Sequence, residues 1–155
     1  MKKAFTMLEL IFVIVVIGIL SSVALPKFAG AGNSAYMAKA KNTLAIVRSA
    51  ISTERQRRIL AGMAGSNITA LNKTDTNGTS ANVFDHFDAA GGVSKPVIDT
   101  PISQCINGGV ACWQVNGNTY TYVFPDGNGK KAQFTLANNR LDCSGDAAEC
   151  AKISN

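Results

Sequence analysis

The feature that most constrains this chain is a long apolar stretch close to its N-terminus. Between Glu9 and Lys27 lie 17 residues, Leu10–Pro26, and none of them is charged. The 21 residues Phe5–Leu25 would be about 31 Å long as a helix, which matches the hydrocarbon core of a bilayer. The stretch is apolar on every face, whereas a surface helix of a soluble protein needs a polar side. We therefore expect residues 5–26 to form a transmembrane helix.

The flanking residues predict how this helix is oriented. Lys2 and Lys3 precede it, and basic residues stay preferentially on the cytoplasmic side of a membrane. Everything after Lys27 would then be extracytoplasmic. The four cysteines of the chain all follow Lys27, and disulfides persist in oxidising compartments, which agrees with this orientation.

Charge is distributed unevenly over the 155 residues. Residues 1–60 carry nine basic and two acidic side chains, a net +7, whereas residues 61–155 carry six and eight, a net −2. Charged residues make up 16% of the chain and apolar residues 46%, which excludes a disordered, highly charged protein. The length suits one domain. From the uneven charge we expect a basic helical shaft followed by a small head, residues 63–155.

Residues 27–62 have the periodicity of an amphipathic helix. Their apolar positions recur at spacings of three and four and would form one stripe that packs on the head: Met37, Ala40, Leu44, Val47 and Ile51. Pro26 removes one helical hydrogen bond at the junction with the transmembrane half, which predicts a kink or a weak segment there. Gly62 and Gly65 predict the end of the helix.

The head has the pattern of a small antiparallel meander. Three short runs are rich in aromatic and β-branched residues and are separated by turn sequences: Cys112–Val115, Thr119–Phe124 and Lys131–Leu136. Tyr120, Tyr122 and Phe124 would share one face of the middle strand. We expect a short helical turn at Val83–Ala90, and loops at 91–111 and 137–155. The predicted fold class is α+β, a long N-terminal helix packed on a small antiparallel sheet.

The cysteines form two Cys-x6-Cys pairs, and four cysteines allow three connectivities. Asn107-Gly108-Gly109 is a turn sequence that favours joining Cys105 to Cys112. A zinc site would require short Cys-x2-Cys spacings, which the sequence lacks.

Signals for other chemistry are weak. His86 is the only histidine, and no catalytic motif accompanies it, so we expect no enzymatic activity. Asp126-Gly-Asn-Gly-Lys130 resembles part of a calcium loop but lacks the later acidic ligands, and a hairpin turn explains it. Asp142, Asp146 and Glu149 form a second weak acidic cluster. Calcium stays open as an alternative, and no metal or other cofactor is expected.

Two surface motifs have equally ordinary explanations. Arg48 and the run Arg55-Gln-Arg-Arg58 could contact DNA, but no aromatic residues are interleaved to stack on bases, and cations are favoured at a helix C-terminus. We therefore expect a solvated helix end and no nucleic-acid partner. Asp75-Thr-Asn77-Gly-Thr79 fits a bacterial N-glycosylation pattern that also arises by chance.

The N-terminus carries a specific signature. A short basic leader followed by Ala-Phe-Thr-Met-Leu-Glu-Leu at the start of an apolar helix resembles type IV pilins and type II secretion pseudopilins. The resemblance covers Met1–Pro26 and extends to the helix up to Leu60. It implies that residues 1–4 are a leader, which a prepilin peptidase removes between Ala4 and Phe5 before Phe5 is N-methylated. The family usually has glycine before the cut, where this chain has Ala4.

The resemblance also implies roles for other residues. Glu9 of one subunit would pair with the Phe5 amine of a neighbour, which neutralises both charges in the apolar filament core. The helix around Pro26 would melt and extend as subunits pack together, or it would keep a static kink. Cys143 and Cys150 would close the C-terminal disulfide loop common in pilins.

The function implied by the resemblance is structural. The subunit would be a single-pass prepilin of the bacterial inner membrane with a periplasmic head, polymerising with itself and with minor pilins at an inner-membrane assembly platform. The sequence does not separate a surface pilus from a secretion pseudopilus, or a major from a minor subunit. The alternative is a Sec-secreted or membrane-anchored binding protein, because Ser22-Val23-Ala24 fits a signal-peptidase site before Leu25. Glu9 argues against it, as a charge within the apolar region of a signal peptide.

Overall fold

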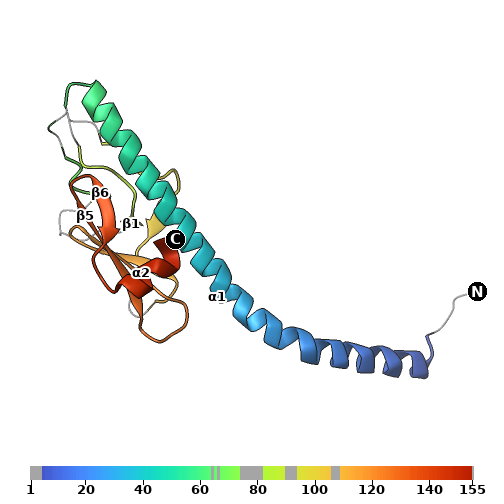
Figure 1. Ribbon diagram of the computed structural model, residues 1–155. Helices are drawn as coiled ribbons and strands as arrows, with labels where there is room; N and C mark the ends of the chain where they lie inside the picture. Colours follow the sequence, from blue (N-terminus) through green and yellow to red (C-terminus); the bar gives the residue numbers. More distant parts are fainter. Residues whose placement is uncertain are drawn as a thin grey trace, which may run out of the picture. The chain divides into compact units, whose positions relative to one another are not determined.

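The computed structural model describes residues 5–63, 65, 67–73, 82–89, 94–105 and 109–154. Helix α1, Met7–Leu60, forms the whole N-terminal part, and Pro26 lies inside it without ending it (Figure 1). The chain divides into two compact units between Ala35 and Tyr36. The remaining elements all belong to the second unit, in which an antiparallel sheet packs with the C-terminal half of α1. The predicted α+β class is confirmed.

The predicted stripe on the second half of α1 is buried. Ala40, Leu44, Val47 and Ile51 are at most 3% exposed, and Met37 is partly buried beside them. The helix ends with Gly62 at a φ of +77°, a conformation that glycine adopts without strain. The N–H groups of Gly62 and Met63 donate to the carbonyls of Ile59 and Arg58, at 3.0 and 2.8 Å. These bonds form a Schellman cap, so the predicted end at Gly62 is confirmed.

The main sheet has four antiparallel strands in the order β3-β4-β5-β6. They are β3 Cys112–Asn116, β4 Thr119–Val123, β5 Lys131–Ala137 and β6 Arg140–Cys143. The first three strands were predicted, but the expected loop over 137–155 is wrong. Asn138 and Asn139 have φ of +50° and +59°, as a two-residue hairpin turn of type I′ requires, and the chain returns as β6.

The same stretch also contains a second helix, α2, at Ala147–Ser154. Asp146 caps its start, since its Oδ1 accepts hydrogen bonds from the N–H groups of Ala148 and Glu149 at 2.8 and 3.3 Å. Cys150 and Ile153 are buried on one side of α2. The helix thus covers β5 with an apolar face, although its eight residues are too few to be stable alone.

A two-stranded sheet pairs β1, Asn82–Val83, with β2, Ile102–Ser103. The helical turn expected at Val83–Ala90 is wrong over its described residues, 83–89, and β2 lies inside the expected loop. Phe84 has a φ of +59°, which is incompatible with a right-handed helix, and its side chain is fully buried. Tertiary packing of the Phe84 ring therefore determines the local backbone conformation.

The core of the head is built largely from aromatic rings. Phe84 stacks on Tyr120 with ring centroids 4.9 Å apart and meets the edge of Trp113 at 5.1 Å. Tyr120, Tyr122 and Phe124 are all buried, as expected for one face of β4. These rings belong to the same apolar cluster as the stripe of α1. The members of this cluster in the described part of the chain all follow residue 36, and their burial stabilises the head.

Candidate functional site

The first half of α1 exposes its apolar side chains. Phe5, Leu8, Phe12 and Leu25 are 70–78% exposed, and Leu20 is 65% exposed. This helix is long and apolar enough to span a membrane. A contiguous apolar surface of this size is unfavourable in water and requires a covering, which a lipid bilayer or other apolar helices can supply.

Thr6 fixes the point at which this helix begins. Its Oγ1 accepts a hydrogen bond from the Glu9 N–H at 3.2 Å, and its carbonyl accepts one from Leu10. Thr-x-x-Glu is the spacing of a capping box, a signal that the sequence analysis did not use. The cap places Glu9 in the first turn, where the helix dipole favours a carboxylate, and Phe5 just outside the helix. Both side chains are exposed; Ala4 lies outside the described residues.

Pro26 is the one proline in α1. Because it has no N–H, the helix lacks the hydrogen bond that position 26 would donate to the Ser22 carbonyl. The Ser22 hydroxyl donates at 2.7 Å to the Ile19 carbonyl, one position out of the regular ladder. The helix continues through Pro26 and lacks one hydrogen bond there. Whether this position melts in a filament stays a prediction.

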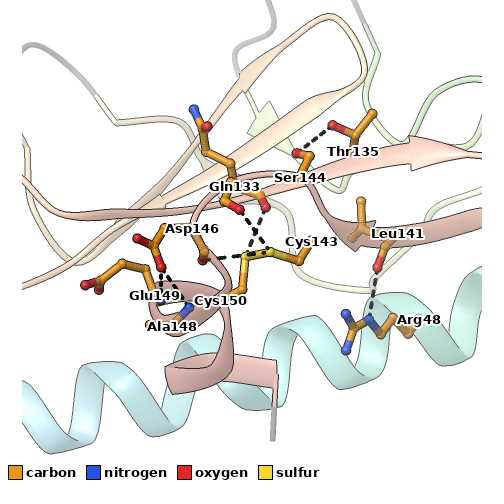
Figure 2. Close-up of a disulfide and its surroundings, with 11 residues drawn as sticks. Arg48, Gln133, Thr135, Leu141, Cys143, Ser144, Asp146, Ala148, Glu149 and Cys150 are labelled. Carbon is orange, nitrogen blue, oxygen red and sulfur yellow. Dashed lines mark hydrogen bonds between the residues drawn. A yellow bond between two sulfur atoms is a disulfide. The ribbon is translucent and has the colours of Figure 1, made fainter.

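The two disulfides join Cys105 to Cys112 and Cys143 to Cys150. This is the local connectivity expected from the sequence. The first ties the segment after β2 to the start of β3, and residues 106–108 of its loop lie outside the described residues. The second ties the end of β6 to α2, and Figure 2 shows it beneath Gln133 of β5. Cys150 is 2% exposed and belongs to the core, whereas Cys143 is exposed, so the bridge joins the core to the surface of the head.

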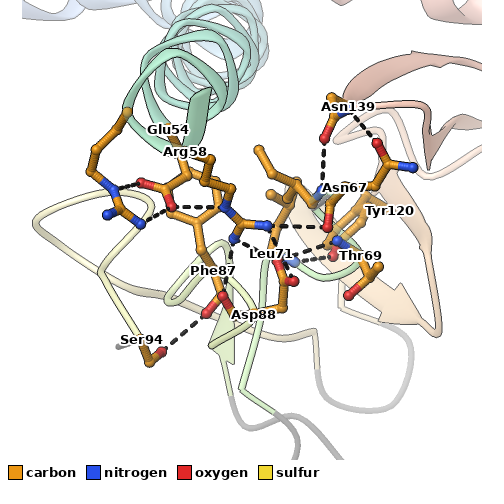
Figure 3. A network of polar contacts seen from close by, with 12 residues as sticks. Glu54, Arg58, Asn67, Thr69, Leu71, Phe87, Asp88, Ser94, Tyr120 and Asn139 are labelled. Carbon is orange, nitrogen blue, oxygen red and sulfur yellow. Dashed lines mark hydrogen bonds and ion pairs between the residues drawn. The ribbon is translucent and has the colours of Figure 1, made fainter. Parts of the chain in front are cut away.

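The end of α1 carries a polar network that was not predicted. The guanidinium of Arg58 is 1% exposed and donates to Glu54 Oε1 at 2.9 Å and Asp88 Oδ1 at 3.0 Å. It also donates to the carbonyls of Asn67 and Asp88, both at 3.1 Å (Figure 3). A buried arginine is tolerated only when its donors are satisfied, and here five protein oxygens accept hydrogen bonds from it, the fifth being Asp88 Oδ2 at 3.4 Å. The expected solvated helix end is therefore wrong for Arg58.

Glu54 is the acidic centre of this network. Its oxygens accept hydrogen bonds from Arg57 at 2.6 and 2.7 Å as well as the bond from Arg58. The hydrogen bonds from Arg57, with a further contribution from Arg58, lower the pKa of Glu54 to about 2, against the opposing effect of burial. The carboxylate is thus ionised at neutral pH. The network fastens α1 to the segments around 67 and 88.

The acidic residues considered for calcium have other partners. Asp126 Oδ1 accepts the Asn128 N–H at 3.3 Å within the β4–β5 turn, and Glu149 pairs with Lys130 at 3.2 Å and with Lys152. Asp142 pairs with Arg140. Over the described part of the chain, no three His, Cys, Asp or Glu side chains lie close enough to hold a metal ion.

His86 is partly exposed, with Nδ1 3.5 Å from Asp85 Oδ2. Its main chain forms an isolated antiparallel bridge with Pro96. The candidate glycosylation site at Asn77 lies outside the described residues.

The chain was compared with family models, curated proteins and solved structures, and none of them matches it. The candidate site is therefore defined by its own geometry. It is the exposed apolar first half of α1, which Thr6 caps and which has Glu9 in its first turn.

Proposed function

We propose that the chain is a structural subunit of the type IV pilin or type II secretion pseudopilin kind. It would be held in the inner membrane by the first half of α1 and would polymerise through that half into a filament. The observation that carries this proposal is the contrast between the two halves of one helix. Leu44 of the second half is 1% exposed in the head core, whereas Leu20 of the first half is 65% exposed.

Glu9 makes a filament a better explanation than a simple anchor. A carboxylate in a membrane helix costs about 2.5–3.5 kcal/mol at the bilayer centre and less near the interface. The Thr6 cap and the helix dipole stabilise Glu9 only in part. After cleavage before Phe5, the new amine would lie one helical turn from Glu9 of its own chain. It would be free to pair with Glu9 of a neighbouring chain, which neutralises both charges and sets the axial offset between subunits.

Polymerisation then has a defined driving force. Each subunit would transfer its apolar half from lipid into a bundle of identical helices, where van der Waals packing and the Glu9 pair favour association. The head, with its own core and two disulfides, would project outward into the periplasm. The proposal covers both a surface pilus and a periplasmic pseudopilus, assembled with minor pilins at an inner-membrane platform.

The test is filament assembly by Glu9 variants, viewed by electron microscopy of cells that do or do not express the chain. We expect Glu9→Gln to insert into the membrane normally and to lose filaments, because its amide cannot neutralise the Phe5 amine. Glu9→Asp keeps the charge and should retain filaments. Normal filaments from Glu9→Gln would contradict the pairing. A soluble product that begins at Leu25 would favour the Sec-secreted alternative.

A further inference from the structure

A groove of about 480 Å³ lies in the head, where the second half of α1 passes β6. The helix lines it with Arg48, Ser52 and Arg55, which are spaced by four and three residues and therefore share one face of α1. Ile51 and Leu141 also line the groove and are at most 3% exposed. The groove thus combines buried apolar residues with a row of hydrogen-bond donors from one helix face.

Arg48 is held in a fixed position beside this groove. Its side chain is half-buried, and its Nε donates a hydrogen bond of 3.2 Å to the Leu141 carbonyl (Figure 2). The guanidinium also lies over the ring of Phe134, 5.7 Å from the ring centroid, within the range of a cation–π contact. Its terminal N–H groups have no partner among the residues that the structure describes. Arg48 is therefore oriented in advance, with these donors left to bind a ligand.

Ser52 and Arg55 continue the row of donors along the groove. Both are exposed, and neither has a hydrogen bond or ionic partner in the described part of the chain. Arg55 comes seven residues after Arg48, which is about 10.5 Å of helix rise at 1.5 Å per residue. Arg48 cannot move towards Arg55 without giving up its bond to the Leu141 carbonyl. The two guanidiniums are therefore suited to a ligand with two anionic groups, with the Ser52 hydroxyl between them.

The other charged residues that line the groove neutralise each other. Arg140 Nε lies 3.2 Å from Asp142 Oδ2, and Arg140 Nη2 donates to Asp142 Oδ1 at 3.4 Å. With this pair counted, the groove has a net charge of +2, which comes from Arg48 and Arg55. A guanidinium matches the oxygens of a phosphoryl group with two parallel hydrogen bonds. The groove is therefore complementary to a phosphorylated anion.

We propose that this groove binds a diphosphate group, either free or carried by a larger molecule. The terminal N–H groups of Arg48 would contact one phosphoryl group and Arg55 the other, and the Ser52 hydroxyl would donate to an oxygen between them. A nucleic-acid strand fits less well, because no aromatic ring lines the groove to stack on bases. The proposal concerns the head alone and does not depend on filament formation.

The test is isothermal titration calorimetry of the full chain in a non-ionic detergent with sodium pyrophosphate at low ionic strength. We expect saturable one-to-one binding, and weaker binding of orthophosphate, which cannot reach both arginines. Arg55→Gln should weaken pyrophosphate binding about tenfold, through one lost charged hydrogen-bonding group. The matched control is Lys39→Gln, which removes the same charge from an exposed position on the opposite face of α1 and should leave the affinity within about twofold.

A second variant separates the shape of the donor from its charge. Arg48→Lys keeps the positive charge but loses the planar fork, so it should also weaken binding several-fold while circular dichroism shows the native fold. Adenosine diphosphate and farnesyl diphosphate then identify the carrier, since they present the same group on a soluble and on a lipid molecule. Tighter binding of either one than of pyrophosphate, dependent on Arg55, would support the site.

Three results would overturn the proposal. The first is an absence of saturable pyrophosphate binding. The second is an equal loss of affinity in Arg55→Gln and Lys39→Gln, which would show general attraction of anions to a basic chain. The third is tighter binding of a single-stranded thymidine oligonucleotide than of pyrophosphate through Arg55, which would assign the groove to nucleic acid.

Discussion

The two halves of α1 are one continuous helix, yet they solve the problem of burying apolar surface in different ways. The second half has a stripe, Ala40 to Ile51, and covers it with the aromatic core of its own head. The first half is apolar all round, and its large side chains stay exposed. The comparison teaches that one helix can bury its apolar side chains within its own chain over one half. Over the other half it requires a membrane or other subunits to cover them.

The largest effect on stability should come from the polar network around Arg58, at the end of the second half of α1. Arg58→Ala would leave Glu54 and Asp88 without their buried partner, and breaking a buried pair in this way costs about 3–5 kcal/mol. Urea unfolding in non-ionic detergent, followed by the fluorescence of Trp113, measures it. Arg55→Ala is the matched control, since Arg55 is exposed one turn away and should change stability by less than about 0.5 kcal/mol. Equal effects of the two variants would refute the role assigned to Arg58.

A pair of leucine variants compares the two halves directly. Leu44→Ala removes a side chain that is 1% exposed and should destabilise the head by about 3 kcal/mol through lost burial and a cavity. Leu20→Ala removes one that is 65% exposed and should leave unfolding of the head within about 0.5 kcal/mol. The same urea titration checks both. A large effect of Leu20→Ala on the head would show that the two halves are not energetically separate.

The Cys143–Cys150 bridge lies in the head and should affect only the head. Replacing both cysteines with alanine opens a loop with a sequence separation of 7, which should cost about 2.5 kcal/mol from chain entropy. Urea unfolding under non-reducing conditions measures this cost, and flotation of membranes checks that insertion of the first half is unchanged. An unaltered urea midpoint would mean that α2 is held without the bridge.

The smallest expected effect is a loss of head stability at acidic pH. The pKa of Glu54 is about 2 in the folded protein, below the value of about 4.5 for a free carboxyl. A lowered pKa stabilises the fold above the unfolded value, and this contribution is lost as pH falls through the folded one. We expect the head to lose about 2 kcal/mol between pH 4 and pH 2 from this group. In Glu54→Gln this part of the pH dependence should be absent, and its persistence would assign the acid sensitivity elsewhere.

The sequence predicted the parts of this fold that depend on local pattern. Spacing and turn residues predicted the stripe from Ala40 to Ile51, the helix end at Gly62, the first three strands and the Cys105–Cys112 pairing. The Cys143–Cys150 pairing was implied by the resemblance to pilins. β6 was missed because Arg140–Cys143 is short and mostly polar, although Asn138-Asn139 is a usable hairpin signal. Thr6 was missed in the same way, because the capping-box spacing to Glu9 was not read.

Other features could not be predicted from local pattern. The spacing of Glu54 and Arg58 suits an ion pair, but the burial of Arg58 depends on Asp88, 30 residues away. The positive φ of Phe84 depends on the rings of Trp113 and Tyr120, which come from strands formed later in the chain. Such contacts are decided by tertiary packing, which a single sequence does not encode in its periodicity.

The most direct test of the central proposal is the identity of the mature N-terminus. The chain is purified from membranes of a bacterium with a prepilin peptidase, and its N-terminal peptide is analysed by mass spectrometry. The account predicts a chain that begins at N-methylated Phe5, because the apolar half must keep its full length and gain an amine to pair with Glu9. A chain that begins at Leu25 has lost that half, and it would contradict the account.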